Sequence, residues 1–134
     1  MYAQITSIKN RLQAALGAPW VVVDGTEPQD RRDTPRADVR LSGATFKSAS
    51  GPGVTLQPQY LVRLVVDAGA QHQPFALLDA AFDAAIASLH NWRPQGATSR
   101  LALQGVAAVD STGADLFGYD LGFVLTTTRQ GCDD

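Results

Sequence analysis

Apolar residues near the N-terminus recur at steps of three and four, the spacing of a helix that buries one face. The stripe consists of Ile5, Ile8, Leu12 and Leu16. Gly17 and Pro19 follow it directly and act as stop signals. The pattern predicts an amphipathic helix that ends at about residue 16.

A second helical stripe begins at Pro74, a residue that is favoured in the first turn of a helix. Its apolar positions are Phe75, Leu78, Phe82, Ile86 and Leu89. Six alanines leave much of the remaining surface small, so another backbone can approach this helix closely. Pro94 and Gly96 end the segment.

The other apolar segments alternate in the manner of strands. Between residues 37 and 41 the odd positions are apolar, whereas Asp38 and Arg40 are expected to face water. Residues 60–67 are almost continuously apolar, which is typical of a central strand. The predicted strands cover residues 20–23, 37–46, 60–67, 100–110 and 119–129.

The element order is therefore α-β-β-β-α-β-β, with hairpins joining most strands. This order predicts a single α+β domain over residues 1–134, with a mostly antiparallel sheet of about five strands and two helices on one face. Residues 47–59 are rich in Ser, Gly and Pro, and we expect a long hairpin tip or mobile loop there. A second mobile loop is expected at about residues 24–36.

Composition excludes several functional classes. The net charge is −2, and the basic residues outside the segment 24–41 are scattered singly, so specific nucleic-acid binding is not expected. The single cysteine, Cys132, cannot form an intramolecular disulfide. We find neither a signal peptide nor a run of roughly 20 apolar residues that could span a membrane. A cytoplasmic site of synthesis is expected.

The sequence contains no catalytic signature. His72 and His90 have no further ligand at metal-binding spacing, and no GxSxG motif is present. Asp79 and Asp83 lie four residues apart on the second helix, where they could act as an acid/base pair but are more simply a solvated flank. We therefore expect no catalytic residue, no metal and no cofactor.

The segment from Asp24 to Leu41 holds more than a third of all charged residues, with five acids, four arginines and no lysine. One interpretation is a solvated loop, in which each ion pair contributes about 0 to 1 kcal/mol. The other is a subunit interface, because arginine pairs carboxylates bidentately and mixed signs allow head-to-tail contacts that close into a ring. The interface candidates are Asp30, Arg31, Arg32, Asp33 and Arg36.

Nearly the whole chain resembles the tail terminator, or tail-completion, proteins of tailed phages. The resemblance rests on the element order, on the charged segment after the first strand, and on the segments ITSIKNRLQAAL, PQYLVRLVVD, FALLDAAFDAAIASLHNWRP, RLALQGVAAVD and YDLGFVLTTTR.

This resemblance implies a ring of six copies in a virion tail of phage or prophage origin, assembled in the bacterial cytoplasm. The ring would cap the tail tube, stop its polymerisation and offer a surface to a head or neck protein. Some members of the family are monomeric in isolation. The expected loop residues facing the tube or a neighbouring subunit are Lys47, Ser50, Gly51, Pro52 and Gly53.

Two alternatives remain open from the sequence. One is a head–tail connector or neck protein of similar size. The other is a small enzyme or ligand-binding module that uses the surface near Asp79, Asp83 and His90.

Overall fold

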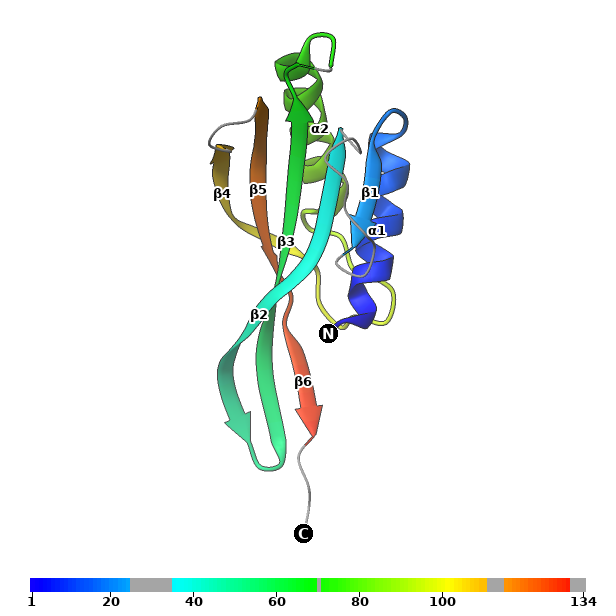
Figure 1. The fold of residues 1–134 in the computed structure, drawn as a ribbon. Coiled ribbons are helices and arrows are strands. Elements are labelled where there is room, and N and C mark those ends of the chain that lie inside the picture. The colour runs from blue at the N-terminus through cyan, green and yellow to red at the C-terminus, as the bar shows by residue number, and fades with distance from the viewer. Residues whose placement is uncertain (25–34, 70, 111–114, 131–134) are drawn as a thin grey trace.

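The computed structural model describes residues 1–24, 35–69, 71–110 and 115–130. It has two helices, α1 (Ala3–Leu16) and α2 (Pro74–Leu89). Its strands are β1 (Val21–Asp24), β2 (Arg36–Ser50), β3 (Gly53–Asp67), β4 (Ala102–Asp110), β5 (Leu116–Val124) and β6 (Thr127–Gln130). Figure 1 shows these elements in a single α+β domain, as the element order predicts.

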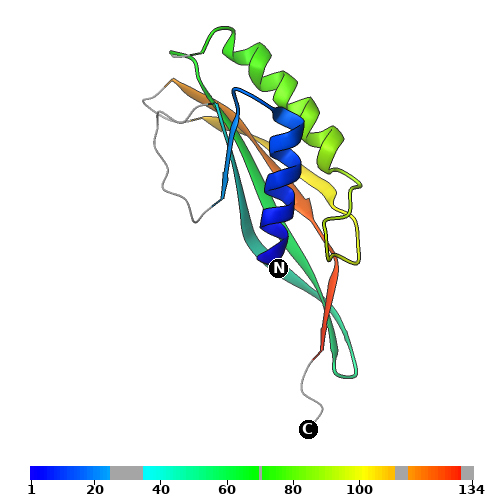
Figure 2. The same ribbon diagram turned by 90° about the vertical axis from the view of Figure 1, so that its right-hand side faces the viewer.

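Five strands form the main sheet in the order β1-β2-β3-β5-β4, and we call this sheet with its two helices the body. β6 pairs with the first residues of β3, Gly53 to Leu56. Neighbouring strands are antiparallel except β1 and β2, which run parallel. The predicted central strand is confirmed, because β3 lies between β2 and β5. Both helices cover the same face of the sheet (Figure 2), so that, among the residues described, no helix lies on the opposite face.

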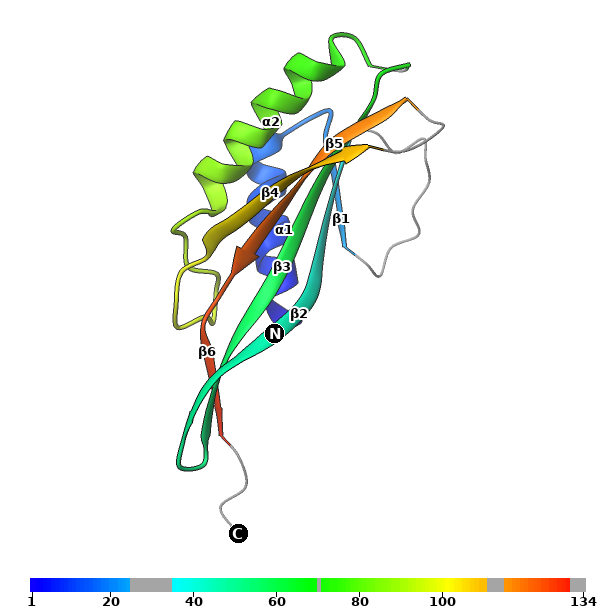
Figure 3. The ribbon, with the colours of Figure 1, turned by 90° about the vertical axis from the view of Figure 1, so that its left-hand side faces the viewer.

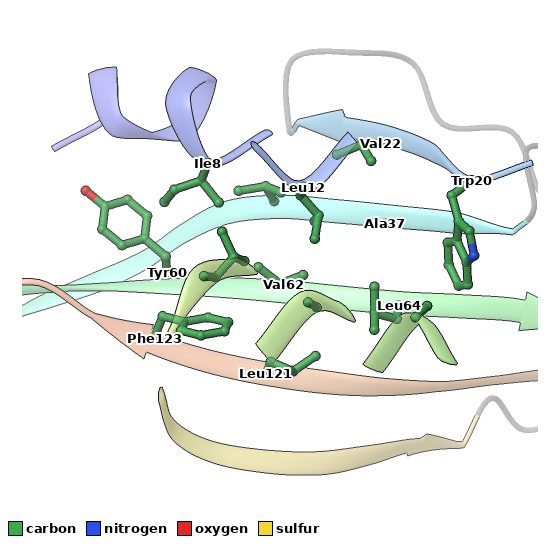
Figure 4. Packing of buried hydrophobic residues seen from close by; sticks show 14 of the residues in the cluster. Ile8, Leu12, Trp20, Val22, Ala37, Tyr60, Val62, Leu64, Leu121 and Phe123 are labelled. Atoms are coloured by element: carbon green, nitrogen blue, oxygen red, sulfur yellow. The ribbon is translucent and has the colours of Figure 1, made fainter. Parts of the chain in front are cut away.

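The core lies between the two helices and the sheet. From α1, Ile8 and Leu12 join a cluster of buried residues that includes Val62 of β3 and Leu121 of β5 (Figure 4). The chain turns from α1 into β1 at Gly17, whose φ of 66° is a left-handed conformation that suits glycine. This arrangement agrees with the helical period of the N-terminal segment.

The buried face of α2 is rotated about the helix axis relative to the predicted apolar stripe. Leu78 and Leu89 are buried as expected, but Ala81 and Ala85 complete the buried face, and Phe75 is 56% exposed. The small alanines let the helix pack closely in the core. The larger rings lie at its flank instead, where Phe75 contacts Phe117 and Phe82 contacts Tyr119 of β5.

Two expectations along the strands are corrected. Residues 47–59, expected as a long hairpin tip or a mobile loop rather than a regular element, do form the end of a hairpin, but all except the turn at Gly51 and Pro52 belong to the regular strands β2 and β3. The expected last strand is divided into β5 and β6, since Leu125 donates its backbone N–H to Pro58 and Thr126 donates its own to Ser99. Pairing with β6 gives the backbone of residues 53–56 regular partners that composition could not reveal.

The distal ends of β2 and β3 project from the body together with β6 (Figure 3). We call this three-stranded projection, residues 43–58 and 127–130, the arm. The side chains of β2 from Ala44 to Ser50 are exposed, and Phe46 is 62% exposed. The arm therefore depends on backbone pairing more than on a core of its own.

Candidate assembly surface

A row of charged side chains crosses the face of the sheet that the helices leave open. We call it the charged row; it consists of Arg36, Asp38 and Arg40 of β2, Arg63 of β3 and Asp120 of β5. The strand register places Asp38 directly opposite Arg63, and Arg63 directly opposite Asp120. Opposite charges in directly paired positions stabilise a sheet.

A bidentate pair of the charged row joins β3 to β5. Arg63 donates from Nε to Asp120 Oδ1 over 2.8 Å and from Nη2 to Asp120 Oδ2 over 2.9 Å. This fork geometry is bidentate and fixes both side chains. The hydrogen bonds to Asp120 raise the pKa of Arg63, and the charge of Asp38 adds to the effect.

Asp38 was expected to face water, but it is only 2% exposed. Its carboxylate Oδ2 lies 3.3 Å from Arg36 Nε and 3.8 Å from Arg40 Nη2. The parallel strand β1 places Val23, itself buried, opposite Asp38. Asp38 is therefore a buried acid with guanidinium groups of its own strand on either side.

The structure describes one of the five interface candidates. Arg36 is the first residue of β2 and belongs to the charged row. The other four, Asp30, Arg31, Arg32 and Asp33, lie outside the described residues. Their role at an interface stays a prediction.

The five loop candidates all lie in the arm. Lys47 and Ser50 are exposed on β2, Gly51 and Pro52 form the turn, and Gly53 begins β3. Gly51 has a φ of 57°, a left-handed conformation that glycine adopts without strain. The structure therefore places these residues together at the tip of a regular hairpin.

The alternative site near the second helix is not assembled. Asp79 accepts a hydrogen bond from the Tyr119 hydroxyl over 3.2 Å, while His90 follows the end of α2 and accepts from the Leu103 backbone N–H through Nδ1. Eleven residues separate Asp79 from His90, which corresponds to about 16 Å along a helix. Asp83 is exposed between them. These three side chains do not converge on one point.

Among the described residues, no group of three or more His, Cys, Asp or Glu side chains is placed to hold a metal ion. Neither α1 nor α2, the helices of these residues, is long and apolar enough to cross a membrane.

Sequence reasoning missed most of the charged row. The alternation of Asp38 and Arg40 on one strand was visible, but Arg63 stood alone among apolar residues and Asp120 lay far along the chain. Only the strand register brings them together.

Comparison with known proteins gives a match in fold alone. No family model and no curated protein matches the sequence. Among solved structures, the chain is similar to a chain in the "Virion of native gene transfer agent (GTA) particle", with a TM-score of 0.63 and 20% sequence identity. The match covers 96% of this chain and 91% of that chain. The two chains therefore share a fold over nearly their full lengths.

Proposed function

We propose that this protein is a structural component of a phage-like virion that caps the tail tube as a ring. The observation that carries the proposal is the fold shared with a chain of a gene transfer agent virion over 96% of this chain. The resemblance of the sequence to tail terminators supports the finer assignment. In this role the ring, a hexamer when assembled, stops tube polymerisation and presents a surface to a head or neck protein.

Two features of the molecule support a role in assembly. The arm exposes Phe46 and the hairpin tip away from the body, where a neighbouring subunit or the tube can reach them. The open sheet face presents the charged row, whose planar arginines suit contacts with carboxylates of another chain. No catalytic role is assigned to any residue.

The proposal is tested by deleting the gene for this protein in the cells that produce the particles and examining their lysate by electron microscopy. We expect tail tubes of variable and excessive length, together with heads that carry no tail, because nothing terminates the tube. Tubes of normal length attached to heads would contradict the capping role.

A sharper test addresses the interface candidates. Replacing Arg31 and Arg32 by glutamate reverses their charge, and we expect a folded protein that no longer restores tail completion. Circular dichroism checks the fold and particle counts check assembly. The matched control replaces Arg31 and Arg32 by lysine, which keeps both positive charges and is expected to restore tail completion. Normal assembly with the double variant would remove these arginines from the interface.

A head–tail connector is the second candidate, because a fold shared with a virion chain fits either position in a particle. The two roles differ in what the purified protein binds. Binding to the ends of isolated tubes supports termination, whereas binding to filled heads alone supports a connector.

The enzymatic or ligand-binding module is tested separately. Alanine at Asp79, Asp83 and His90 together is expected to leave tail completion unchanged. If the triple variant folds normally but no longer completes tails, this surface is needed for function and the alternative is supported.

A further inference from the structure

Three arginines that are distant in the sequence meet in one groove at the C-terminal end of α2. The groove has a volume of about 680 Å³. Arg11 comes from α1, and Arg93 and Arg100 come from the connection between α2 and β4, which runs beside α1 (Figure 2). We call this site the arginine groove; Ser88, His90 and Trp92 also line it.

Arg11 is held in place by two contacts. Its Nε donates a hydrogen bond to the Ser88 backbone oxygen over 3.0 Å, and its guanidinium carbon lies 5.0 Å from the centre of a Trp92 ring. Stacking on an indole orients the planar guanidinium. Within the described part of the chain, its two terminal nitrogens have no hydrogen-bond acceptor and can donate to a ligand.

Arg100 and Arg93 add donors on the same wall. Arg100 donates from Nη1 to the Asn91 backbone oxygen over 3.0 Å, which anchors that side chain. Arg93 is exposed and makes no hydrogen bond or ion pair with any described residue. His90 accepts at Nδ1 from the Leu103 N–H, so Nε2 carries the proton of the neutral ring and is a further donor.

The arginine groove differs from the charged row in its lack of carboxylates. Arg36, Arg40 and Arg63 each lie beside Asp38 or Asp120. By contrast, the groove arginines have no carboxylate partner among the described residues, and none of the described residues that line the groove is acidic. The whole chain has a net charge of −2, so this concentration of positive charge is local.

We propose that the arginine groove binds an acidic segment of a partner protein through its carboxylates. Planar guanidinium groups pair carboxylates bidentately, and all three strong cations of the groove are arginines. Nucleic acid fits less well, because phosphate-backbone binding builds its affinity from about 6 to 10 contacts and the groove offers three arginines. This inference concerns the groove alone and does not depend on ring formation.

Fluorescence anisotropy with the purified protein tests the proposal. The probe is a labelled peptide of alternating Glu and Ser, at about 50 mM salt because screening weakens exposed ion pairs. We expect the Arg93→Gln and Arg100→Gln double variant to bind about tenfold more weakly, since each exposed ion pair contributes up to about a factor of five. Arg93→Gln alone, which removes no described internal contact, is expected to weaken binding several-fold.

The matched control is the double variant Lys47→Gln and Arg129→Gln, which changes the net charge equally but lies in the arm. It is expected to bind the peptide as the unchanged protein does. No binding by the unchanged protein, or equal weakening in both double variants, would overturn the proposal.

Two further measurements distinguish other occupants. Tighter binding of a thymidine oligonucleotide with the same number of negative charges would identify nucleic acid as the ligand and overturn the proposal. Sedimentation of the protein without peptide tests a second copy as the occupant. If the unchanged protein self-associates and the groove variant does not, the acidic segment belongs to a second copy of this chain, and the proposal of a different partner protein is overturned. We expect the oligonucleotide to bind more weakly than the acidic peptide. We also expect the unchanged protein and the groove variant to show the same sedimentation.

Discussion

At the scale of single residues, burial separates the two aspartates of the charged row. Asp38 is 3% exposed at its side chain and is flanked by Arg36 and Arg40, whereas Asp120 is 20% exposed and faces Arg63, which is 38% exposed. Removing one partner of a buried pair leaves the other charge without compensation in a poorly solvated place, but a surface pair is screened by water. The two aspartates should therefore contribute unequally to stability.

We predict that Asp38→Ala lowers the free energy of unfolding by about 2 to 4 kcal/mol. Asp120→Ala is the matched comparison and should lower it by about 1 kcal/mol or less. Urea denaturation of both variants measures the difference. Equal losses would show that burial does not set the contribution of these pairs.

A second residue makes stability depend on pH. Tyr60 is 1% exposed and its hydroxyl donates to the Met1 backbone oxygen over 2.7 Å. Burial raises the pKa of Tyr60 to about 12, although the charge of Arg129 opposes the rise. An unfolded tyrosine has a pKa near 10, so between these values the folded chain binds more protons than the unfolded chain.

We therefore predict that stability is unaffected by this group below pH 10 and falls above it, by up to about 1.4 kcal/mol per pH unit until pH 12. Tyr60→Phe should show a smaller decline over that range, because it cannot ionise, and should lose about 1 kcal/mol at neutral pH with the hydrogen bond. Urea denaturation at several pH values compares the two proteins. Parallel declines would contradict the prediction.

At the scale of elements, the arm is the part whose structure depends least on burial. Its hairpin is regular, but the side chains of Ala44 to Ser50 are exposed, whereas Val62, Leu64 and Val66 of the same β3 strand are fully buried in the body. Segments with little buried apolar surface open at lower free energy than the core. Regular pairing and mobility are separate properties, and mobility of residues 47–59 stays a prediction.

We predict that backbone amides of residues 46–56 exchange with deuterium at least about a hundredfold faster than those of residues 62–66, since local opening of the arm leaves the body folded. Hydrogen exchange followed by mass spectrometry measures both segments in one sample. Equal protection would show that the arm opens only with the whole molecule.

At the scale of the whole molecule, both helices and the sheet share one core. This core contains Ile8 of α1, Leu78 of α2 and Phe123 of β5, and it includes Trp20 before β1. Because one core connects all these elements, we expect them to unfold together.

We predict that urea unfolding of the body is two-state. Tryptophan fluorescence, which reports on buried Trp20 and on Trp92 in the arginine groove, should give the same midpoint as circular dichroism of the backbone. Separate midpoints would indicate that α1 and the groove unfold independently of the sheet.

The sequence by itself determined the class of fold, the number of helices and the position of β3 in the centre. Helical and strand periods are local, so Ile8 and Leu12 could be assigned to a buried face before any tertiary contact was known. The same local information favoured a solvated position for Asp38, because alternation reports the face of a strand and not what covers it.

Only the tertiary structure decided the features that carry the functional argument. The charged row needs the register of three strands, the regular arm needs β6 to pair with a segment about seventy residues earlier, and the arginine groove needs α1 packed beside the connection after α2. Each joins residues that are distant along the chain. Contacts of this kind depend on how the elements pack, and no local pattern of hydrophobic and polar positions specifies them.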